Sequence, residues 1–273
     1  MPELPEVEVI RRGLAPHVVG RRVTGVHFST KKLRLPVERG RMRRTLPGAG
    51  IAGVGRRGKY LLLETDTGAV LVVHLGMSGR LGLFAATAPV ATHDHFRLSL
   101  DDGMEIRFND PRRFGCLQLA ADREQCDALF AELGPEPLEE EFSGIYLAAR
   151  AAGRSQPVKS FLMDSRTVVG IGNIYASEIL HAACIRPETA IGTVTAAGWR
   201  RLAEESKKVL TEAIRQGGTT ISDYVNASGE PGYFQNVLQV YGRGGEPCHR
   251  CGSRIERTVM AGRATYFCRR CQR

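Results

Sequence analysis

Four cysteines near the carboxyl end constrain the fold of this chain more than any other feature of its sequence. They form two CxxC pairs, Cys248 with Cys251 and Cys268 with Cys271, and sixteen residues separate the pairs. Each CxxC turn brings two thiolates to one side, and four thiolates complete the tetrahedral shell of one Zn²⁺ ion. Because a module of fewer than forty residues has too small a core to fold alone, the metal would supply much of its stability.

The segment between the cysteine pairs predicts a β-hairpin. Two β-rich runs, residues 254–259 and 264–268, flank a turn-forming sequence at 260–263. Arg263 lies at the expected tip, where a guanidinium would reach a phosphate; a solvated arginine without a ligand is the alternative. The sequence therefore predicts a small, arginine-rich zinc module that binds nucleic acid.

Two disulfides are the alternative use of the four thiols. The chain begins with the acidic segment MPELPEVEVIRR, which lacks the basic-then-apolar order of a secretory signal. It also has no apolar run near the roughly 18 residues of a membrane span. We therefore expect a cytoplasmic protein without membrane contact, whose reduced thiols favour a metal over disulfides. With all four positions filled by protein, the zinc would be structural, and any chemistry must be sought elsewhere.

The charge of the chain is positive and unevenly distributed. The formal net charge is +9 and the isoelectric point is near 9.4, which favours a polyanionic partner. Residues 1–50 hold eleven Lys or Arg against four acids, and residues 236–273 hold eight arginines against two acids. The sign reverses in residues 122–141, which hold eight acids and one arginine. A protein that closes on nucleic acid from both ends of its chain would have this pattern.

The apolar periodicity changes twice along the chain. Residues 3–19 have a helical spacing of apolar side chains. Turn signals separate the β-rich runs that follow, which predict a β-sandwich: VTGVHF, KYLLLE, AVLVVHL, FRLSL, MEIRF and GCLQL. Beyond about residue 122 the spacing is helical again, with helices expected at 124–133, 143–152, 158–163, 173–183 and 195–216.

These changes indicate a multidomain α+β protein. We expect an amino-terminal helix and β-sandwich domain at 1–130, a helical domain at 131–235 and the zinc module at 236–273. Residues 219–233 form a long loop in this interpretation, and loops of that length are often functional.

The amino terminus offers a nucleophile. Pro2 follows Met1, and a small second residue normally allows the initiator methionine to be removed. The mature chain would then begin with a secondary amine, and an α-amine has a pKa near 8, so part of it is neutral at pH 7. Such an amine can attack an aldehyde-like sugar carbon and form an iminium, with Glu3 and Glu6 near enough for acid or base help. A helix start whose acids complement the helix dipole is the alternative.

From end to end, the chain resembles the formamidopyrimidine-DNA glycosylases. Its opening PELPEVE is similar to the start of that family, whereas the related endonuclease VIII branch usually begins PEGPE. The resemblance implies a helix–two-turn–helix in the helical domain and a lid at 219–233 that cradles a flipped base. The other matching motifs follow in the family's order and span essentially the whole chain: GRRGKYLLL, HLGMSGRL, NDPRRFG, VVGIGNIYASE, GGTTISDYV, GEPGYFQNVLQVYGRGGEPC and GRATYFCRRCQ.

The resemblance implies a monomeric DNA glycosylase and AP lyase of bacterial base-excision repair, associated with the nucleoid. The family excises 8-oxoguanine paired with cytosine and ring-opened formamidopyrimidines from duplex DNA, then cuts the strand on both sides of the sugar. By resemblance, Pro2 is the nucleophile at the sugar C1′, and Glu3 protonates the sugar as the base departs. Lys59 resembles the proton donor of β-elimination, and Arg263 resembles that of δ-elimination.

The family pattern also implies a set of DNA-binding residues. Met77, Arg112 and Phe114 resemble the three residues that fill the void left by a flipped nucleotide. Met77 and Phe114 would replace lost stacking, while the planar guanidinium suits the orphaned cytosine; core packing is the alternative for the two apolar side chains. Asn173 begins a helix, so amides there can face a phosphate. The other expected DNA contacts are His74, His93, Arg154, Lys159 and Tyr241.

Two other functions are compatible with the sequence. One is an endonuclease VIII-like glycosylase for oxidised pyrimidines, which would share the fold. The other is a DNA-binding protein that keeps the clamp without the chemistry, although the presence of Pro2, Glu3 and Lys59 argues against it.

Overall fold

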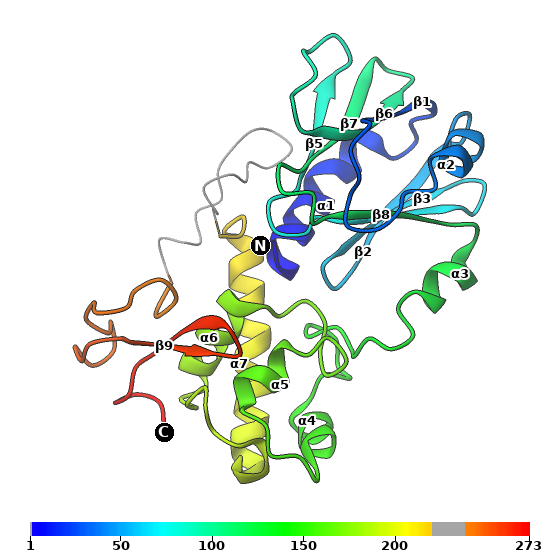
Figure 1. Ribbon diagram of the computed structural model, residues 1–273. Coiled ribbons are helices and arrows are strands. Elements are labelled where there is room, and N and C mark those ends of the chain that lie inside the picture. The colour runs from blue at the N-terminus through cyan, green and yellow to red at the C-terminus, as the bar shows by residue number, and fades with distance from the viewer. Residues whose placement is uncertain (1, 220–237) are drawn as a thin grey trace. The chain divides into compact units, whose positions relative to one another are not determined.

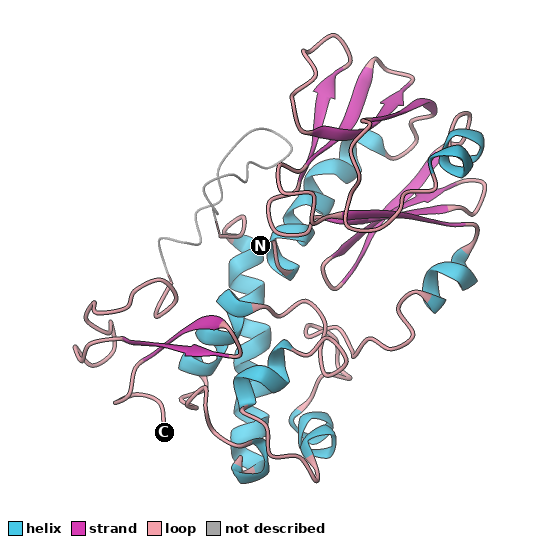
Figure 2. Ribbon diagram, in the orientation of Figure 1, coloured by secondary structure: helices cyan, strands magenta, loops and turns pink. Residues whose placement is uncertain are grey.

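In the computed structural model, the chain divides into two compact units (Figure 1). The first comprises residues 1–131 and 217–232, and the second comprises residues 132–216 and 233–273. Of these, the structure describes residues 2–219 and 238–273. Strands dominate the first unit and helices the second (Figure 2), which agrees with the predicted order of β-rich and helical segments.

Two four-stranded antiparallel sheets build the first unit. One has the order β1-β6-β7-β5, with β1 at Val23–Phe28, β6 at Asp94–Leu100, β7 at Met104–Asn109 and β5 at Arg80–Ala85. The other has the order β2-β3-β4-β8, with β2 at Ile51–Arg57, β3 at Tyr60–Thr65, β4 at Val70–His74 and β8 at Cys116–Ala120. The short helices of this unit are α2 at Arg39–Thr45 and α3 at Arg123–Ala128.

A single apolar core joins helix α1 (Leu4–Val18) to both sheets. The helix buries Val7, Ile10 and Leu14 on one face, in line with the helical spacing of its sequence. Its partners include Leu71 of one sheet and Phe96 of the other. This shared core confirms the predicted amino-terminal helix and β-sandwich, and it anchors the helix that directly follows the predicted nucleophile.

Strands β2 and β5 lie outside the β-rich runs that the sequence indicates. Both contain glycines, which have little intrinsic preference for strands. In the sheets these glycines leave room for larger neighbours: a Cβ at Gly53 would lie 3.1 Å from Glu64 Oε2, and one at Gly82 would lie 2.9 Å from the Phe84 ring. Neighbouring side chains, rather than local propensity, therefore decide the conformation of these strands.

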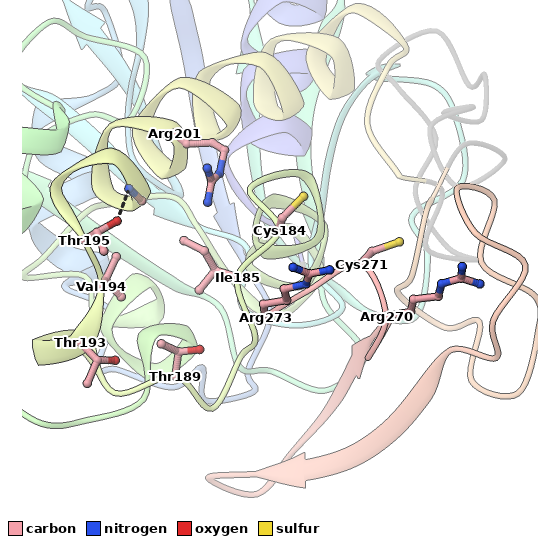
Figure 3. A pocket seen from close by; sticks show the side chains of 11 residues that line it. Cys184, Ile185, Thr189, Thr193, Val194, Thr195, Arg201, Arg270, Cys271 and Arg273 are labelled. Carbon is pink, nitrogen blue, oxygen red and sulfur yellow. Dashed lines mark hydrogen bonds between the residues drawn. The ribbon is translucent and has the colours of Figure 1, made fainter.

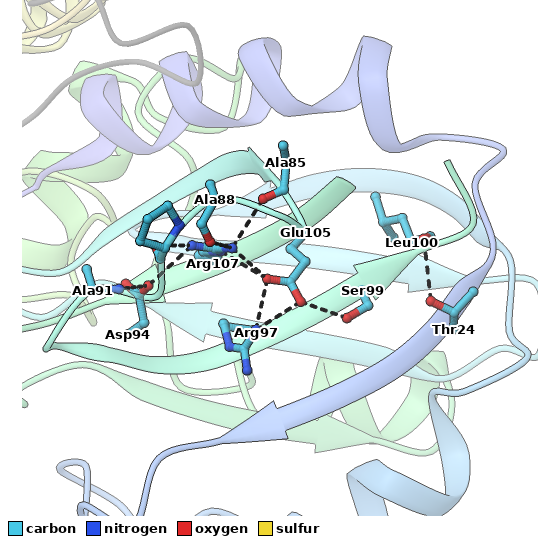
Figure 4. Close-up of polar contacts among 11 residues, drawn as sticks. Thr24, Ala85, Ala88, Ala91, Asp94, Arg97, Ser99, Leu100, Glu105 and Arg107 are labelled. Carbon is cyan, nitrogen blue, oxygen red and sulfur yellow. Dashed lines mark hydrogen bonds and ion pairs between the residues drawn. The ribbon is translucent and has the colours of Figure 1, made fainter. Parts of the chain in front are cut away.

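A network of buried charges covers one face of the β1-β6-β7-β5 sheet (Figure 4). Glu105 accepts hydrogen bonds from Ser99 at 2.9 Å and from Arg97 at 3.1 Å. Burial alone would raise the pKa of Glu105, but these hydrogen bonds lower it below its usual value. Arg107 completes the network, because it binds Glu105 and also donates hydrogen bonds to the end of β5 and the loop that follows it. The acceptors there are the carbonyls of Ala85, Ala88 and Pro89.

The second unit is built around the long helix α7 (Ala196–Arg215). Thr195 caps its start by accepting a hydrogen bond from the backbone N–H of Gly198 at 3.1 Å. The core includes an edge-on pair of rings from Phe161 and Trp199, with centroids 5.6 Å apart. The helices predicted in this unit are confirmed to within one residue at each end: α4 at Gly144–Ala151, α5 at Val158–Met163, α6 at Asn173–Ala182 and α7. A short 3₁₀ turn, η1, lies at Ile191–Thr193. The helix predicted at 124–133 is shorter than expected, since α3 ends at Ala128.

The carboxyl-terminal hairpin lies in the second unit. Strands β9 (Glu256–Met260) and β10 (Arg263–Phe267) pair antiparallel, with Met260 opposite Arg263. Ala261 and Gly262 form the two-residue turn, and both have positive φ, as a tight hairpin of this kind requires. The hairpin predicted between the cysteine pairs is therefore confirmed.

Across the described residues, none of the helices combines the length and the apolar character needed to cross a membrane.

Candidate functional site

The amino-terminal end of α1 holds two of the predicted catalytic residues in buried positions. Pro2 is buried, and Glu3, which precedes the helix, is 1% exposed. Pro5 lies in the first helical turn, where a missing N–H costs no hydrogen bond. The backbone N–H of Glu3 donates to Glu6 Oε2 at 2.8 Å, so the side chain of Glu6 caps the amino-terminal end of α1. The local sequence thus holds Pro2 and Glu3 together at one end of an anchored helix.

Glu6 connects this helix to a segment 213 residues later in the chain. It is fully buried, and its Oε1 accepts hydrogen bonds from the backbone N–H and the hydroxyl of Thr219, each at 2.9 Å. Both carboxylate oxygens are thus engaged by the protein, which suits a positioning role better than acid or base help. The rest of the predicted lid, residues 220–233, lies outside the described residues.

Lys59 and His74 are neighbours at the ends of adjacent strands. Lys59 lies in the turn between β2 and β3, and His74 ends β4. Burial and the charge of Lys59 lower the pKa of His74 to about 4, so the imidazole is neutral at pH 7. Its Nδ1 accepts a hydrogen bond from the backbone N–H of Gly76 at 3.0 Å, which leaves the ring proton on Nε2. His74 can therefore offer a neutral N–H to a phosphate.

The three predicted void-filling residues lie on two adjoining loops. Met77 is 40% exposed and Phe114 is 43% exposed, unlike the apolar side chains of the sandwich core. The guanidinium of Arg112 lies over the Phe114 ring, 4.8 Å from its centroid. A Cβ at Gly76, whose φ is +65°, would stand 2.4 Å from the Phe114 carbonyl carbon, so the two backbones touch and this position requires glycine. The structure thus brings two exposed apolar side chains and a planar cation close together.

Asp110, which is not among the residues predicted from the sequence, ties these two loops to each other. It is fully buried; its Oδ1 accepts from Ser78 Oγ at 2.7 Å and its Oδ2 accepts from the backbone N–H of Gly115 at 2.8 Å. Ser78 Oγ also accepts from the backbone N–H of Arg112 at 3.3 Å. A signal was present in NDPRRFG, because an aspartate in a turn often binds nearby backbone amides.

A buried histidine supports Asp110 from the other side. His95 Nε2 donates to the Asp110 carbonyl at 3.0 Å, and its Nδ1 accepts from the Ser29 hydroxyl at 2.9 Å. His93, the predicted DNA contact, is exposed two residues earlier, and its carbonyl accepts from the Asp110 backbone N–H at 3.0 Å. The predicted residue His93 is thus held by the same aspartate that ties the two loops.

Lys159 and Asn173 join the start of α6 to the zinc hairpin. Lys159 is 2% exposed, and its Nζ donates to Asn173 Oδ1 and Thr265 Oγ1, each at 2.7 Å. Asn173 Nδ2 donates to the carbonyl of Ala264 at 3.0 Å. A phosphate would have to displace one of these acceptors to reach Lys159. The geometry therefore gives Lys159 the task of holding Asn173 against β10.

Glu178 anchors the segment that leads into the zinc module. Its carboxylate is 3% exposed and accepts hydrogen bonds from the backbone N–H groups of Gln239, Val240 and Tyr241 at 2.8 to 2.9 Å. The Tyr241 ring, a predicted DNA contact, packs edge-on against Tyr266 with centroids 5.2 Å apart. The sequence hints at a buried role for Glu178, because its carboxylate lies within the apolar helix segment NIYASEIL. The sequence does not reveal the hydrogen-bond partners of Glu178, which lie 61 to 63 residues away.

The last two predicted residues are exposed on the second unit. Arg263 begins β10 next to the hairpin turn. Arg154 lies between α4 and α5, and it lines a pocket of about 420 Å³ with two further arginines, Arg150 and Arg166. Both guanidinium groups are therefore accessible to an anion.

The four cysteine sulfurs of the zinc module lie within 4.8 Å of one another. The sulfurs of Cys248 and Cys271 are 3.9 Å apart, and those of Cys251 and Cys268 are 3.5 Å apart. A tetrahedral zinc ion with bonds of about 2.3 Å places its sulfurs about 3.8 Å apart, whereas a disulfide requires about 2 Å. The geometry fits one metal ion and excludes the two-disulfide alternative.

A pocket of about 490 Å³ opens beside the metal ligand Cys271 (Figure 3). Arg201, Arg270 and Arg273 line it together with the thiol of Cys184. Four thiolates around a divalent ion leave a net negative charge, which the nearby guanidinium groups partly offset.

Comparison with known protein families accounts for most of the chain. Residues 1–117 match the formamidopyrimidine-DNA glycosylase N-terminal domain, and residues 133–225 match the formamidopyrimidine-DNA glycosylase H2TH domain. Residues 245–273 match the zinc finger found in FPG and IleRS. Together with the sulfur geometry, this last match shows that Cys248, Cys251, Cys268 and Cys271 hold one structural zinc ion.

Individual relatives are similar over the full length. Proteins named formamidopyrimidine-DNA glycosylase from Xanthomonas oryzae and Xanthomonas campestris are 51% and 50% identical over all 273 residues, with both chains covered completely. Two solved structures of Lactococcus lactis Fpg are 34% identical over 99% of each chain. One is bound to DNA that contains an abasic site, with a TM-score of 0.92, and the other to DNA that contains Fapy-dG, with a TM-score of 0.91. The chain therefore belongs to the formamidopyrimidine-DNA glycosylase family.

Proposed function

We propose that this protein is a bifunctional DNA glycosylase and AP lyase of base-excision repair that removes 8-oxoguanine and formamidopyrimidines from duplex DNA. The observation that carries this proposal is the 51% identity over the complete chain to a formamidopyrimidine-DNA glycosylase. The DNA in the Lactococcus lactis complexes supports it, because Fapy-dG is a substrate of the proposed reaction and an abasic site is its intermediate.

The proposed glycosylase step uses the amino terminus. The nitrogen of Pro2, freed by removal of Met1, attacks C1′ of the damaged nucleotide, and the bond from C1′ to the base breaks. Glu3 protonates the sugar ring as the base departs, and the sugar remains bound to Pro2 as an iminium. The position of Glu3, buried directly beside Pro2, supports this role.

The proposed lyase steps follow from the iminium. The positive nitrogen acidifies the C2′ proton, so its loss expels the 3′ phosphate by β-elimination, and a second elimination expels the 5′ phosphate. Lys59 is the proposed proton donor of the first elimination and Arg263 of the second. Water then hydrolyses the iminium and frees Pro2, leaving a one-nucleotide gap with phosphate at both ends.

The proposed DNA contacts divide into two groups. Met77, Arg112 and Phe114 fill the space of the flipped nucleotide, and their exposure on two joined loops supports this role. The phosphate contacts are His74, His93, Arg154, Asn173 and Tyr241, with Lys159 acting through Asn173. The zinc ion maintains the hairpin that presents Arg263.

We further propose three domains at residues 1–130, 131–235 and 236–273, and a monomer that works on nucleoid DNA in the cytoplasm. Size-exclusion chromatography with light scattering checks the oligomeric state, because a monomer has the mass of one 29.9 kDa chain.

Borohydride trapping on a duplex with one 8-oxoguanine tests the mechanism. Borohydride reduces an iminium to a stable amine, so we expect a covalent protein–DNA adduct that maps to Pro2. A chain with a residue appended before Pro2 should form no adduct. An adduct on a lysine, or none with the unblocked chain, would refute the proposed nucleophile.

Lesion preference separates the proposed function from an endonuclease VIII-like activity on pyrimidines. We expect faster excision from 8-oxoguanine:C than from thymine-glycol:A duplexes under single-turnover conditions. Faster release of thymine glycol would instead assign the chain the pyrimidine activity.

A further inference from the structure

The side chain of His181 reaches the metal centre from the helical part of the second unit. It lies near the end of α6 and is fully buried. Its Nε2 is 3.7 Å from the sulfur of Cys248, a separation that suits a hydrogen bond to sulfur. The two residues are 67 positions apart in the chain, so tertiary packing alone brings them together.

The second ring nitrogen shows which atom carries the proton. His181 Nδ1 is buried and has no hydrogen-bond partner among the described residues. A buried N–H without an acceptor is destabilising, and an unsatisfied acceptor is more readily tolerated than an unsatisfied donor. The neutral ring therefore places its proton on Nε2, where the sulfur of Cys248 accepts it.

Two of the other ligands obtain hydrogen bonds from within the zinc module itself. Cys251 accepts hydrogen bonds from the hydroxyl and the backbone N–H of Ser253. Cys268 faces two backbone N–H groups of its own CxxC turn, those of residues 270 and 271. Cys248 differs, because its imidazole partner belongs to a helix outside the module.

We propose that His181 is a positioning residue of the metal centre, whose Nε2–H donates to the Cys248 thiolate and couples the zinc ion to α6. An outer-shell hydrogen bond orients the ligand and strengthens its hold on the metal. Arg250 supports the same contact, since its Nη1 donates to the His181 carbonyl at 3.2 Å. The other end of α6 begins at Asn173, so one helix joins the metal centre to a proposed phosphate contact.

A matched pair of variants tests the hydrogen bond. His181→Phe preserves a ring without a donor, and His181→Gln supplies an amide N–H of similar reach. We expect zinc transfer to a chromogenic chelator to be about 10–100-fold faster in His181→Phe, the usual cost of losing an outer-shell partner. His181→Gln should restore most of the difference. Equal rates in the wild type and His181→Phe would overturn the proposal, as would equal acceleration in both variants.

Cobalt substitution adds a readout that packing alone would not change. The thiolate-to-cobalt charge-transfer band should move to lower energy in His181→Phe, because a thiolate without its N–H donor gives up an electron more easily. His181→Gln should keep the band near its wild-type position. An unshifted band in His181→Phe contradicts a hydrogen bond to sulfur.

A measurement on the unaltered protein keeps the test independent of how the variants fold. In nitrogen-labelled protein loaded with NMR-active cadmium, the His181 Nε2 proton should show scalar coupling to the metal through the thiolate. A ring protonated on Nδ1 would disprove the proposal, and so would direct nitrogen–cadmium coupling that makes His181 a ligand. None of these readouts depends on glycosylase activity, so the proposed function and this inference can fail separately.

Discussion

Single buried polar residues determine where the exposed functional side chains of the first unit stand. Asp110 is the clearest case, because one carboxylate accepts from Ser78 on one loop and from Gly115 on the other. Met77, Arg112 and Phe114 project from these same two loops. Their relative positions therefore depend on a residue that has no proposed contact with DNA.

Removing the Asp110 carboxylate should loosen both loops. Asp110→Ala leaves two buried donors without their acceptor, so we expect a loss of about 2–4 kcal/mol in the free energy of unfolding. Asp110→Asn keeps one acceptor and should lose less. Denaturant titration measures the stability. The variant should lose more of its single-turnover excision rate on duplex DNA than of its borohydride trapping at an abasic site in single-stranded DNA. Equal effects on both substrates would contradict a role in filling the duplex void.

His74 should act on DNA as a neutral donor. Its pKa of about 4 lies below that of a free histidine, because burial and Lys59 disfavour the charged form. His74→Phe keeps the ring beside Tyr60 but removes the N–H, so we expect about 3–10-fold weaker DNA binding. The ratio of the wild-type DNA affinity to that of His74→Phe should stay constant between about pH 5.5 and 8. A ratio that changes with a midpoint near 6.5 would show that His74 binds as a cation.

At the scale of elements, helix α1 is held to the sandwich by charge as well as by its apolar face. Glu8 is 7% exposed and binds Arg11 and Arg12 on the helix and Arg56 on β2. Burial would raise its pKa, yet the hydrogen bonds and the positive charges lower it to about 2. The ionised carboxylate thus fastens the helix that positions Pro2.

The contribution of Glu8 to stability should depend on pH in a defined direction. Because its pKa is lower in the folded protein than in the unfolded chain, its stabilising effect is complete above about pH 4.5 and disappears as the pH falls towards 2. We expect Glu8→Gln to lose about 1.5–3 kcal/mol at pH 7, and the difference from wild type to shrink through that window. The exposed Glu124→Gln is the control for denaturant titrations at each pH. A difference that persists undiminished below pH 3 would disprove the assignment.

Most elements could be predicted because their signals are local. The spacing of Val7, Ile10 and Leu14 indicates a helix in any tertiary context, and the five later helices follow the same rule. Strands β2 and β5 escaped prediction because their glycines weaken the β-rich pattern, and the packing of Gly53 against Glu64 of β3 arises only in the sheet. The fold class was therefore predictable, but the complete set of strands was not.

The zinc ion is a cofactor on which the folding of one part of the molecule depends. The metal module has few buried apolar residues, among them Val240, Ile255 and Phe267, so its hairpin relies on the ion. The first unit has its own apolar core. Loss of the metal should therefore have separable effects on DNA binding and on folding.

Cys248→Ser should lose zinc and DNA affinity while the first unit stays folded. A serine hydroxyl is a poor zinc ligand, so the hairpin that presents Arg263 would lose its order. Metal analysis, DNA titration and the circular dichroism of the strands measure the three properties. Cys126→Ser is the control, since this buried thiol belongs to the first unit, outside the zinc cluster. Unchanged DNA affinity in Cys248→Ser would show that the module is dispensable.

Local sequence patterns were enough to predict the zinc ligands, most of the helices and strands and, through family resemblance, the proposed nucleophile Pro2. Each of these predictions depends on a short motif or on the local periodicity of apolar residues, and both indicate the same structure in any tertiary context. The pairing of buried polar groups, in contrast, depends on the fold, as in Glu6 with Thr219, Lys159 with Thr265 and His181 with Cys248. A buried donor or acceptor must find a partner, and that partner depends on which distant segments the core brings together.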